Sequence, residues 1–122
     1  MAAGIYNFTI EQGTTVVKQF TYKDASANVV NLDGYDVRMQ IRDTVASSTV
    51  VDTFTTSSGL SILATADSTA SGTIQLRIEA ASSSLYTFIT AVYDIEIEDN
   101  GSPRTVTRLL QGSIKLSPEV TR

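Results

Sequence analysis

The sequence predicts an all-β protein, folded as a single antiparallel β-sandwich domain of about eight strands over residues 1–122. Three observations lead to this fold class. Apolar and polar residues alternate with a period of two along most of the chain. Turn-forming residues separate these segments, and no strand–helix–strand alternation suggests a parallel sheet. Ser and Thr make up 31 of the 122 residues, and Thr favours half-exposed strands.

The first half of the chain contains four predicted strands. Residues 35–42 are the clearest, because Val37, Met39 and Ile41 point to one face and polar residues point to the other. Such strict alternation places one face on a core and the other against water or a partner. We expect strands at 6–10, 16–22, 29–32 and 35–42, separated by turns and short loops.

The second half adds shorter segments and one long hairpin. The only candidate helix, 79–85, is one or two turns long, because its serines favour helices poorly. Asn100-Gly101 predicts a hairpin turn between the last two strands, and Gly112 predicts a bulge in the last one. The size is close to that of an immunoglobulin-like domain, without the buried Cys-Trp-Cys set of antibodies. We expect strands at 50–55, 60–62, 73–78, 90–98 and 104–116.

Missing residue types exclude several functions. The chain has no Cys and no His, which excludes disulfides, thiolate metal sites and a Ser-His-Asp triad. We therefore expect a protein that is not an enzyme and holds no cofactor. The net charge of -4 argues against nucleic acid as a partner. No apolar run approaches the ~20 residues that cross a bilayer, and the start lacks signal-peptide features, so we expect no membrane partner and no secretory signal.

Acidic residues near the end of the 90–98 strand form a candidate calcium site: Asp94, Glu96, Glu98 and Asp99. Alternation places the first three on one strand face, roughly 6.5–7 Å apart. Carboxylate oxygens are suitable calcium ligands. The simpler interpretation is a solvated face, with Arg104 or Arg108 as cross-strand partners. Paired carboxylates also serve glycoside hydrolysis, but a sandwich of this length has little room for the cleft.

The tyrosines form a candidate glycan-binding face: Tyr6, Tyr22, Tyr35, Tyr86 and Tyr93. Flat aromatic rings bind carbohydrate. Tyr22 and Tyr93, however, fall on apolar strand faces, which predicts core positions for both.

Arg38 and Arg42 share the polar face of the 35–42 strand. Surface ion pairs with Asp36 or Asp52 are the simpler interpretation. The alternative is contact with another protein, because Arg is enriched at protein interfaces.

Several stretches together match a known pattern. The opening, 3–13, is followed by Leu-Asp-Gly-Tyr and an alternating, Arg-containing strand in 31–42. A Gly-Thr-Ile segment in 71–74 pairs with Tyr-Asp-Ile-Glu in 93–97, and 107–122 completes the pattern. In this order the stretches resemble small virion proteins of tailed bacteriophages, and are similar to the immunoglobulin-like N-terminal domain of phage upper baseplate proteins.

This resemblance implies a structural virion protein of the tail, baseplate or neck. It would act by stoichiometric binding to other virion proteins in a symmetric, multi-copy assembly. The alternatives are a capsid decoration (cement) protein, and a host carbohydrate- or receptor-binding module that contacts a surface glycan. We expect interface contacts at Ile5, Tyr6, Arg38, Arg42, Arg108, Glu119 and Arg122.

Overall fold

The computed structural model describes residues 4–23, 26, 29–32, 34–63, 72–99 and 101–120. In these residues the chain forms nine strands and one single-turn helix. The elements are β1 (Gly4–Ile5), β2 (Phe8–Glu11), β3 (Val16–Thr21), β4 (Asp36–Arg42), β5 (Val50–Thr55), β6 (Leu60–Leu63), β7 (Thr73–Ile78), α1 (Ala80–Ser83), β8 (Thr90–Glu98) and β9 (Val106–Ser117).

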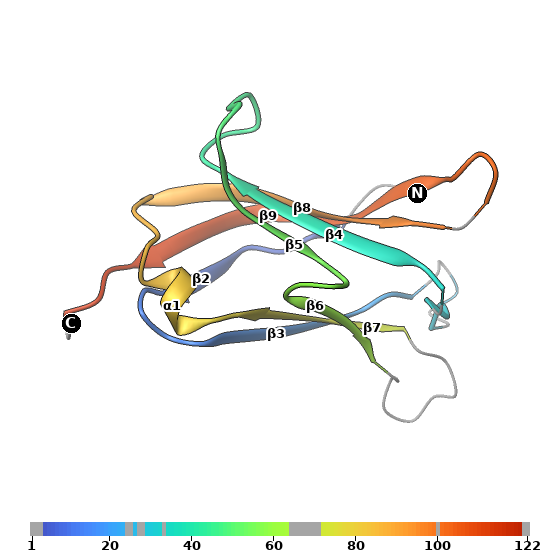
Figure 1. Cartoon of the computed structure of the whole chain (residues 1–122), viewed down its shortest axis with the longest axis horizontal. Coiled ribbons are helices and arrows are strands. Elements are labelled where there is room, and N and C mark those ends of the chain that lie inside the picture. Colours follow the sequence, from blue (N-terminus) through green and yellow to red (C-terminus); the bar gives the residue numbers. More distant parts are fainter. Residues whose placement is uncertain are drawn as a thin grey trace.

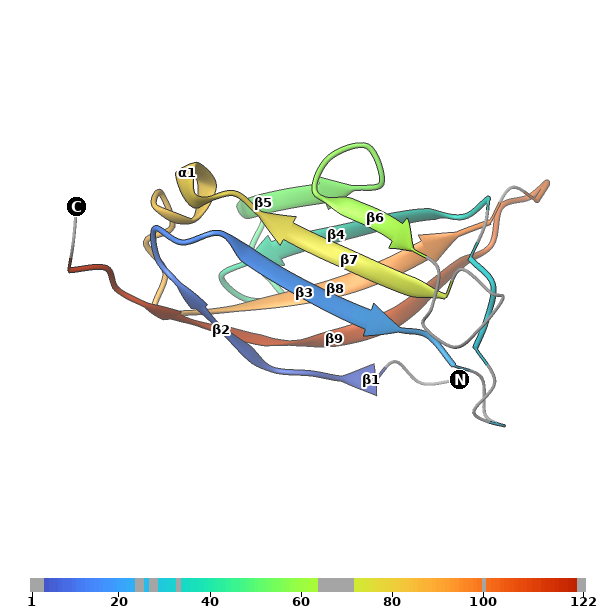
Figure 2. The same ribbon diagram turned by 90° about the horizontal axis from the view of Figure 1, so that it is seen from below.

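The strands form two sheets that pack face to face. The larger sheet has the order β1-β9-β8-β4-β5, with β2 also paired to β9, and the smaller has the order β3-β7-β6. Figure 1 shows the two layers, and Figure 2 views the molecule from the side of the smaller sheet. The predicted all-β sandwich is confirmed.

The core lies between the sheets and follows the predicted alternation. Val37, Met39 and Ile41 of β4 are buried, whereas Asp36 and Arg38 are exposed. The same pattern holds along β8, and along β7 from Ile74 to Ile78, where every second side chain is buried. Burying such a side chain contributes about 1.5–3 kcal/mol of transfer free energy. The two sheets are therefore held together by their alternating apolar faces.

The pairing is antiparallel except at the N-terminal strand. β1 and β2 both run parallel to β9, with Gly4 opposite Leu110 and Phe8 opposite Ile114. The tight turn after β2 leads the chain from the larger sheet into the smaller one, where β3 pairs with β7. The N-terminal segment therefore pairs with the free edge of β9 and runs in the same direction as that strand. Hydrophobic alternation does not encode strand direction, so the sequence carried no signal for this.

Two local predictions are corrected. The last strand is irregular at Leu109, where the β8–β9 register shifts between Ile95 and Glu96, and not at Gly112. Residues 29–32 form no strand; Val29 makes an isolated bridge with Lys23, although Leu32 is fully buried. The apolar residues at 29–32 thus anchor a loop to the core.

The short helix α1 carries the chain from β7 in the smaller sheet to β8 in the larger one (Figure 1). Its Ser83 is fully buried. The Ser83 hydroxyl donates to the Thr14 carbonyl at 2.7 Å and accepts from the Gly13 amide at 3.1 Å. These bonds tie the helix to the β2–β3 turn and satisfy the buried hydroxyl.

Candidate functional site

Charged side chains of β4, β8 and β9 share the outer face of the larger sheet. The β4–β8 register places Arg38 opposite Glu96 and Asp36 opposite Glu98. The β8–β9 register places Glu96 opposite Arg108. The alternation that buries the apolar residues therefore also brings the carboxylates of β8 between arginines from both neighbouring strands.

Ion pairs cross between these strands. Arg38 Nε lies 2.9 Å from Glu96 Oε1, and Arg108 Nε lies 3.4 Å from Asp94 Oδ2. Arg104 lies 3.5 Å from Glu98. The expected cross-strand partnership of the β8 acids with Arg104 and Arg108 is confirmed. All three arginine side chains are about half exposed, so solvent screens each ion pair and each contributes little to stability.

The partners expected for Arg38 and Arg42 are wrong. Asp36 Oδ2 instead accepts a hydrogen bond from Arg104 Nη1 at 3.0 Å. Asp52 accepts a 2.6 Å hydrogen bond from the Tyr86 hydroxyl. Asp36 is two residues from Arg38 on one strand, about 7 Å away, whereas cross-strand neighbours lie about 5 Å apart. Asp52 lies opposite buried Ile41 and therefore on the other face of the sheet.

Three of the four residues of the acidic cluster form ion pairs with arginines: Asp94, Glu96 and Glu98. Within the described ranges no three acidic side chains are grouped as metal ligands would be. Asp99, the fourth candidate, lies beyond the strand and accepts the amides of Gly101 and Thr105, both at 2.9 Å. Its carboxylate therefore closes the hairpin turn.

The pKa of Asp94 is raised above its usual value. Burial is the main cause, and the neighbouring charge of Glu96 adds to it. Arg108, Arg38 and Arg42 act in the opposite direction without cancelling these effects. Asp94 is thus a partly desolvated carboxylate with a like charge beside it.

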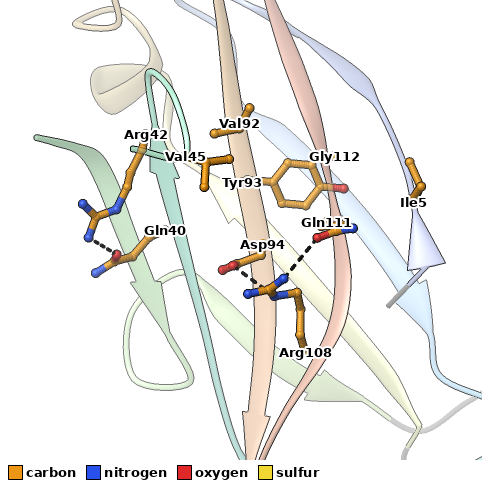
Figure 3. Close-up of a pocket in the computed structure, with 10 residues that line it drawn as sticks. All are labelled: Ile5, Gln40, Arg42, Val45, Val92, Tyr93, Asp94, Arg108, Gln111 and Gly112. Carbon is orange, nitrogen blue, oxygen red and sulfur yellow. Dashed lines mark hydrogen bonds and ion pairs between the residues drawn. The ribbon is translucent and has the colours of Figure 1, made fainter. Parts of the chain in front are cut away.

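A groove of about 550 Å³ opens on this outer face beside Asp94. Figure 3 shows its lining residues, with Arg42 and Ile5 on opposite sides of the Asp94–Arg108 pair. We call it the outer-face groove. Its lining comes from β1, β4, β8, β9 and the loop that follows β4. Residues far apart in the sequence therefore form one surface.

Exposed aliphatic side chains belong to the outer-face groove. Ile5 of β1 is 75% exposed and Val45 of the loop after β4 is 87% exposed. Single exposed aliphatic residues are common on proteins. Two of them on one groove, beside fixed charges, give it the mixed apolar and polar character of a protein contact.

Arg42 differs from the other arginines of this face. Its guanidinium donates to the Ser47 carbonyl at 2.7 Å and to Gln40 Oε1 at 2.9 Å. Among the residues that the structure describes, no carboxylate lies within 4.0 Å of it. These bonds hold the loop that carries Val45, and the guanidinium of Arg42 makes no ion pair with any carboxylate of the described residues.

The predicted interface residues divide into two groups. Ile5, Arg42 and Arg108 come together in the outer-face groove, and Arg38 lies on the same face. Val45 also lines the groove and was not predicted, because a lone Val in a polar loop gives no signal in the sequence.

The remaining predicted contacts lie elsewhere. Tyr6 turns its ring toward Phe8 and Phe20, with centroid separations of 5.8 and 5.6 Å. Glu119 donates its backbone amide to Gln12 at 2.9 Å, away from the groove. Arg122 lies outside the described residues.

The tyrosines do not gather on one exposed face. Tyr86 and Tyr93 are buried, at 5% and 4% exposure. Burial raises the pKa of both hydroxyls, and Asp52 raises that of Tyr86 further. Tyr22 and Tyr35 pack against the core as partly buried residues. Tyr93 is confirmed as a core residue. Tyr6 is the most exposed of the five tyrosines, at 39%.

No protein-family model matches the chain, and no curated protein matches it significantly. In the part of the chain that the structure describes, no helix has the length and apolar character needed to cross a membrane.

Proposed function

We propose that this chain is a structural protein of a tailed-bacteriophage particle, in the tail, baseplate or neck. It acts by stoichiometric binding to neighbouring virion proteins, without catalysing a reaction. The sequence resemblance supplies the type of particle. The outer-face groove supplies the mode of action, and it is the observation that carries the proposal.

Three properties suit the groove for a protein partner. Ile5 and Val45 offer apolar area that a partner can remove from water. Arg42 offers a guanidinium without a carboxylate, and Arg108 and Asp94 offer a fixed charge pair. Exposed charge and apolar area on one surface are typical of non-obligate interfaces.

The chemistry of Arg42 indicates what the partner brings. A carboxylate of the partner would complete a charge-assisted hydrogen bond there, because the planar guanidinium recognises carboxylates well. Apolar side chains of the same partner would cover Ile5 and Val45. We therefore infer a partner segment in which acidic and aliphatic residues alternate or lie close together.

Quantitative mass spectrometry of the purified native particle tests this function. Heads and tails are separated, and the copy number of the chain is measured in each. We expect the chain to partition with tails at a copy number that matches a ring of the assembly. Hundreds of copies on heads would instead indicate capsid decoration. Absence from both fractions would contradict the proposal and favour the host glycan-binding module.

A further inference from the structure

The two sheets of the sandwich have four edges, which differ in how open they are. At the β5 edge, the Thr53 amide donates to Asp52 Oδ1 and the Thr55 amide donates to the Ser58 carbonyl, both at 2.9 Å. The amides of Thr53 and Thr55 are therefore already hydrogen-bonded within the chain. An unprotected edge strand presents free amide and carbonyl groups that can pair with another chain.

Two further edges are short or interrupted. The β6 edge has four residues. On the N-terminal edge, the Tyr6 carbonyl accepts the Tyr93 hydroxyl at 2.6 Å, and the Glu11 carbonyl accepts both the amide and the hydroxyl of Thr14. Neither edge offers a long row of free groups.

The β3 edge is different, because its six residues form an unbroken ladder on one side only. Next to the strand, the Tyr22 amide donates to the Gly72 carbonyl at 2.8 Å. Thr21 lies opposite Thr73 in the same register. Antiparallel hydrogen bonds alternate along a strand, so the even-numbered residues bond to β7. The backbone groups that point outward belong to Val17, Gln19 and Thr21.

The side chains of these three residues lie on the outer face of the smaller sheet. Val17 is 47% exposed. Gln19 Nε2 donates to Gln75 Oε1 of β7 at 2.9 Å. The Thr21 hydroxyl lies 3.1 Å from that of Thr73. The edge is thus uncharged on this face, and its described side chains do not cap its own backbone.

We propose that the β3 edge pairs with β3 of a second copy of this chain. The two strands run antiparallel around a two-fold axis that passes through Gln19. In this register Gln19 meets Gln19 of the partner subunit, and Val17 meets Thr21 of the partner subunit. Sheets β3-β7-β6 of the two copies become one continuous six-stranded sheet. This contact is separate from the outer-face groove and does not rest on the proposed function.

The inward-facing Lys18 selects this register. Its Nζ lies 5.6 Å from the centre of the Phe8 ring. With the axis at Gln19, Lys18 faces Phe20 of the partner subunit, which suits a cation near an aromatic ring. Shifting the axis to Lys18 would place two ammonium groups directly opposite each other, which destabilises a strand pair. An axis at Phe20 would leave only residues 19–21 paired.

The size of the contact predicts its strength. In each chain, the five residues from Val17 to Thr21 form strand-pairing contacts. A standard stable interface has roughly 20–30 residues per side. We therefore expect a concentration-dependent monomer–dimer equilibrium rather than a permanent dimer.

Amide hydrogen exchange of the whole chain, measured by NMR at rising protein concentration, tests the pairing directly. The amides of Val17, Gln19 and Thr21 should become protected as dimer forms. Those of Lys18 and Phe20 already bond to β7 and should change little. Protection without this alternation, or none at all, would overturn the proposal.

Charge variants at the axis provide a second test by sedimentation velocity. Gln19→Lys places two ammonium groups about 5 Å apart across the axis and should abolish the dimer. Gln75→Lys is the matched control: it loses the same Gln19–Gln75 bond and adds the same charge to the same face. Its two charges lie about 14 Å apart in the dimer, beyond the Debye length of about 8 Å, so its dimer should persist.

Mixing Gln19→Lys with Gln19→Glu completes the test. Opposite charges then meet at the axis, and native mass spectrometry should show the mixed dimer returning. A dimer that persists in Gln19→Lys alone, or one that Gln75→Lys abolishes equally, would overturn the proposal. So would a wild-type chain that stays monomeric at millimolar concentration.

Discussion

The Tyr93 hydroxyl donates a 2.6 Å hydrogen bond to the Tyr6 carbonyl, which joins the middle of the larger sheet to the N-terminal strand. Tyr93 lies opposite Gly112 in the β8–β9 ladder. The chain at Tyr6 passes over Gly112, close enough that a side chain there would meet its carbonyl. Between β1 and β2, the chain is therefore held at Tyr6 by a hydrogen bond from Tyr93 and by close packing against Gly112.

Removing the hydroxyl should weaken this attachment. We expect Tyr93→Phe to lower the free energy of unfolding by about 0.5–1.5 kcal/mol, the net value of one hydrogen bond. Urea denaturation measures the change. Exchange of the Tyr6 amide, which bonds to Gln111 at 2.9 Å, should also accelerate. Tyr35→Phe is the control, and equal losses in the two variants would contradict the role of the Tyr93 hydroxyl.

Gly112 should not tolerate a side chain. A Cβ at this position would lie 2.0 Å from the Tyr6 carbonyl oxygen, and moving that backbone would cost roughly 1–3 kcal/mol. At Gly4, on the same strand pair, a Cβ would meet its nearest atom at 3.4 Å. We expect Gly112→Ala to lower the urea midpoint and Gly4→Ala to leave it nearly unchanged. Equal urea midpoints for the two variants would show that the backbone at Tyr6 does not pack closely against Gly112.

Asp94 and Asp99 should titrate on opposite sides of the ordinary aspartate value of 3.8. Burial raises the pKa of Asp94, whereas the amides of Thr105 and Gly101 lower the pKa of Asp99. NMR titration of the side-chain carboxyl carbons measures both. Finding Asp99 above Asp94 would contradict the hydrogen bonds described at the hairpin.

The same shifts give opposite contributions to stability. Asp94 binds its proton more tightly when folded, so its contribution to stability falls as pH rises from 3.8 through its folded pKa. Asp99 binds its proton less tightly when folded, so its contribution is present above pH 3.8. It is lost as pH falls through the lower folded pKa. Asp99→Asn should therefore flatten the acid limb of a stability profile, and an unchanged limb would argue against this assignment.

Arg42 should matter for assembly more than for folding. It bonds to no carboxylate within the described part of the chain, only to Ser47 and Gln40. We expect Arg42→Ala to weaken partner binding roughly tenfold or more, the value of one charged hydrogen bond. The number of copies of the Arg42→Ala protein per particle should therefore be lower than that of the wild-type protein. Arg77→Ala removes an exposed arginine from the other sheet, where it pairs with Glu79, and should leave the copy number unchanged.

The sandwich was predictable because period-two alternation directly reports which side chains are buried. Ile41 and Ile95 are buried where the alternation placed them. The parallel partnership of β2 with β9 was not predictable, since strand direction leaves no trace in hydrophobicity. Leu32 shows a second limit: an apolar residue can anchor a loop to the core as well as form a strand.

The candidate site was predicted only in part. Arg42 and Arg108 were identified from strand faces, but only strand order places them on one groove with Ile5. Arg38 was expected to pair with Asp36 or Asp52, whereas the register of β4 with β8 gives it Glu96. Val45 lies on a loop whose path depends on the bond from Arg42 to Ser47. Registers and loop paths depend on contacts between distant residues, which local patterns do not specify.

Photo-crosslinking in assembled particles can detect the proposed contact of the outer-face groove with another virion protein. The photoreactive residue p-benzoylphenylalanine replaces Val45 in one variant and Ser57, an exposed residue of the β5–β6 turn, in a control. We expect irradiation of purified particles to link position 45, and not position 57, to a single virion protein. Incorporation of both variants without a crosslink at position 45 would show that the outer-face groove does not contact another virion protein.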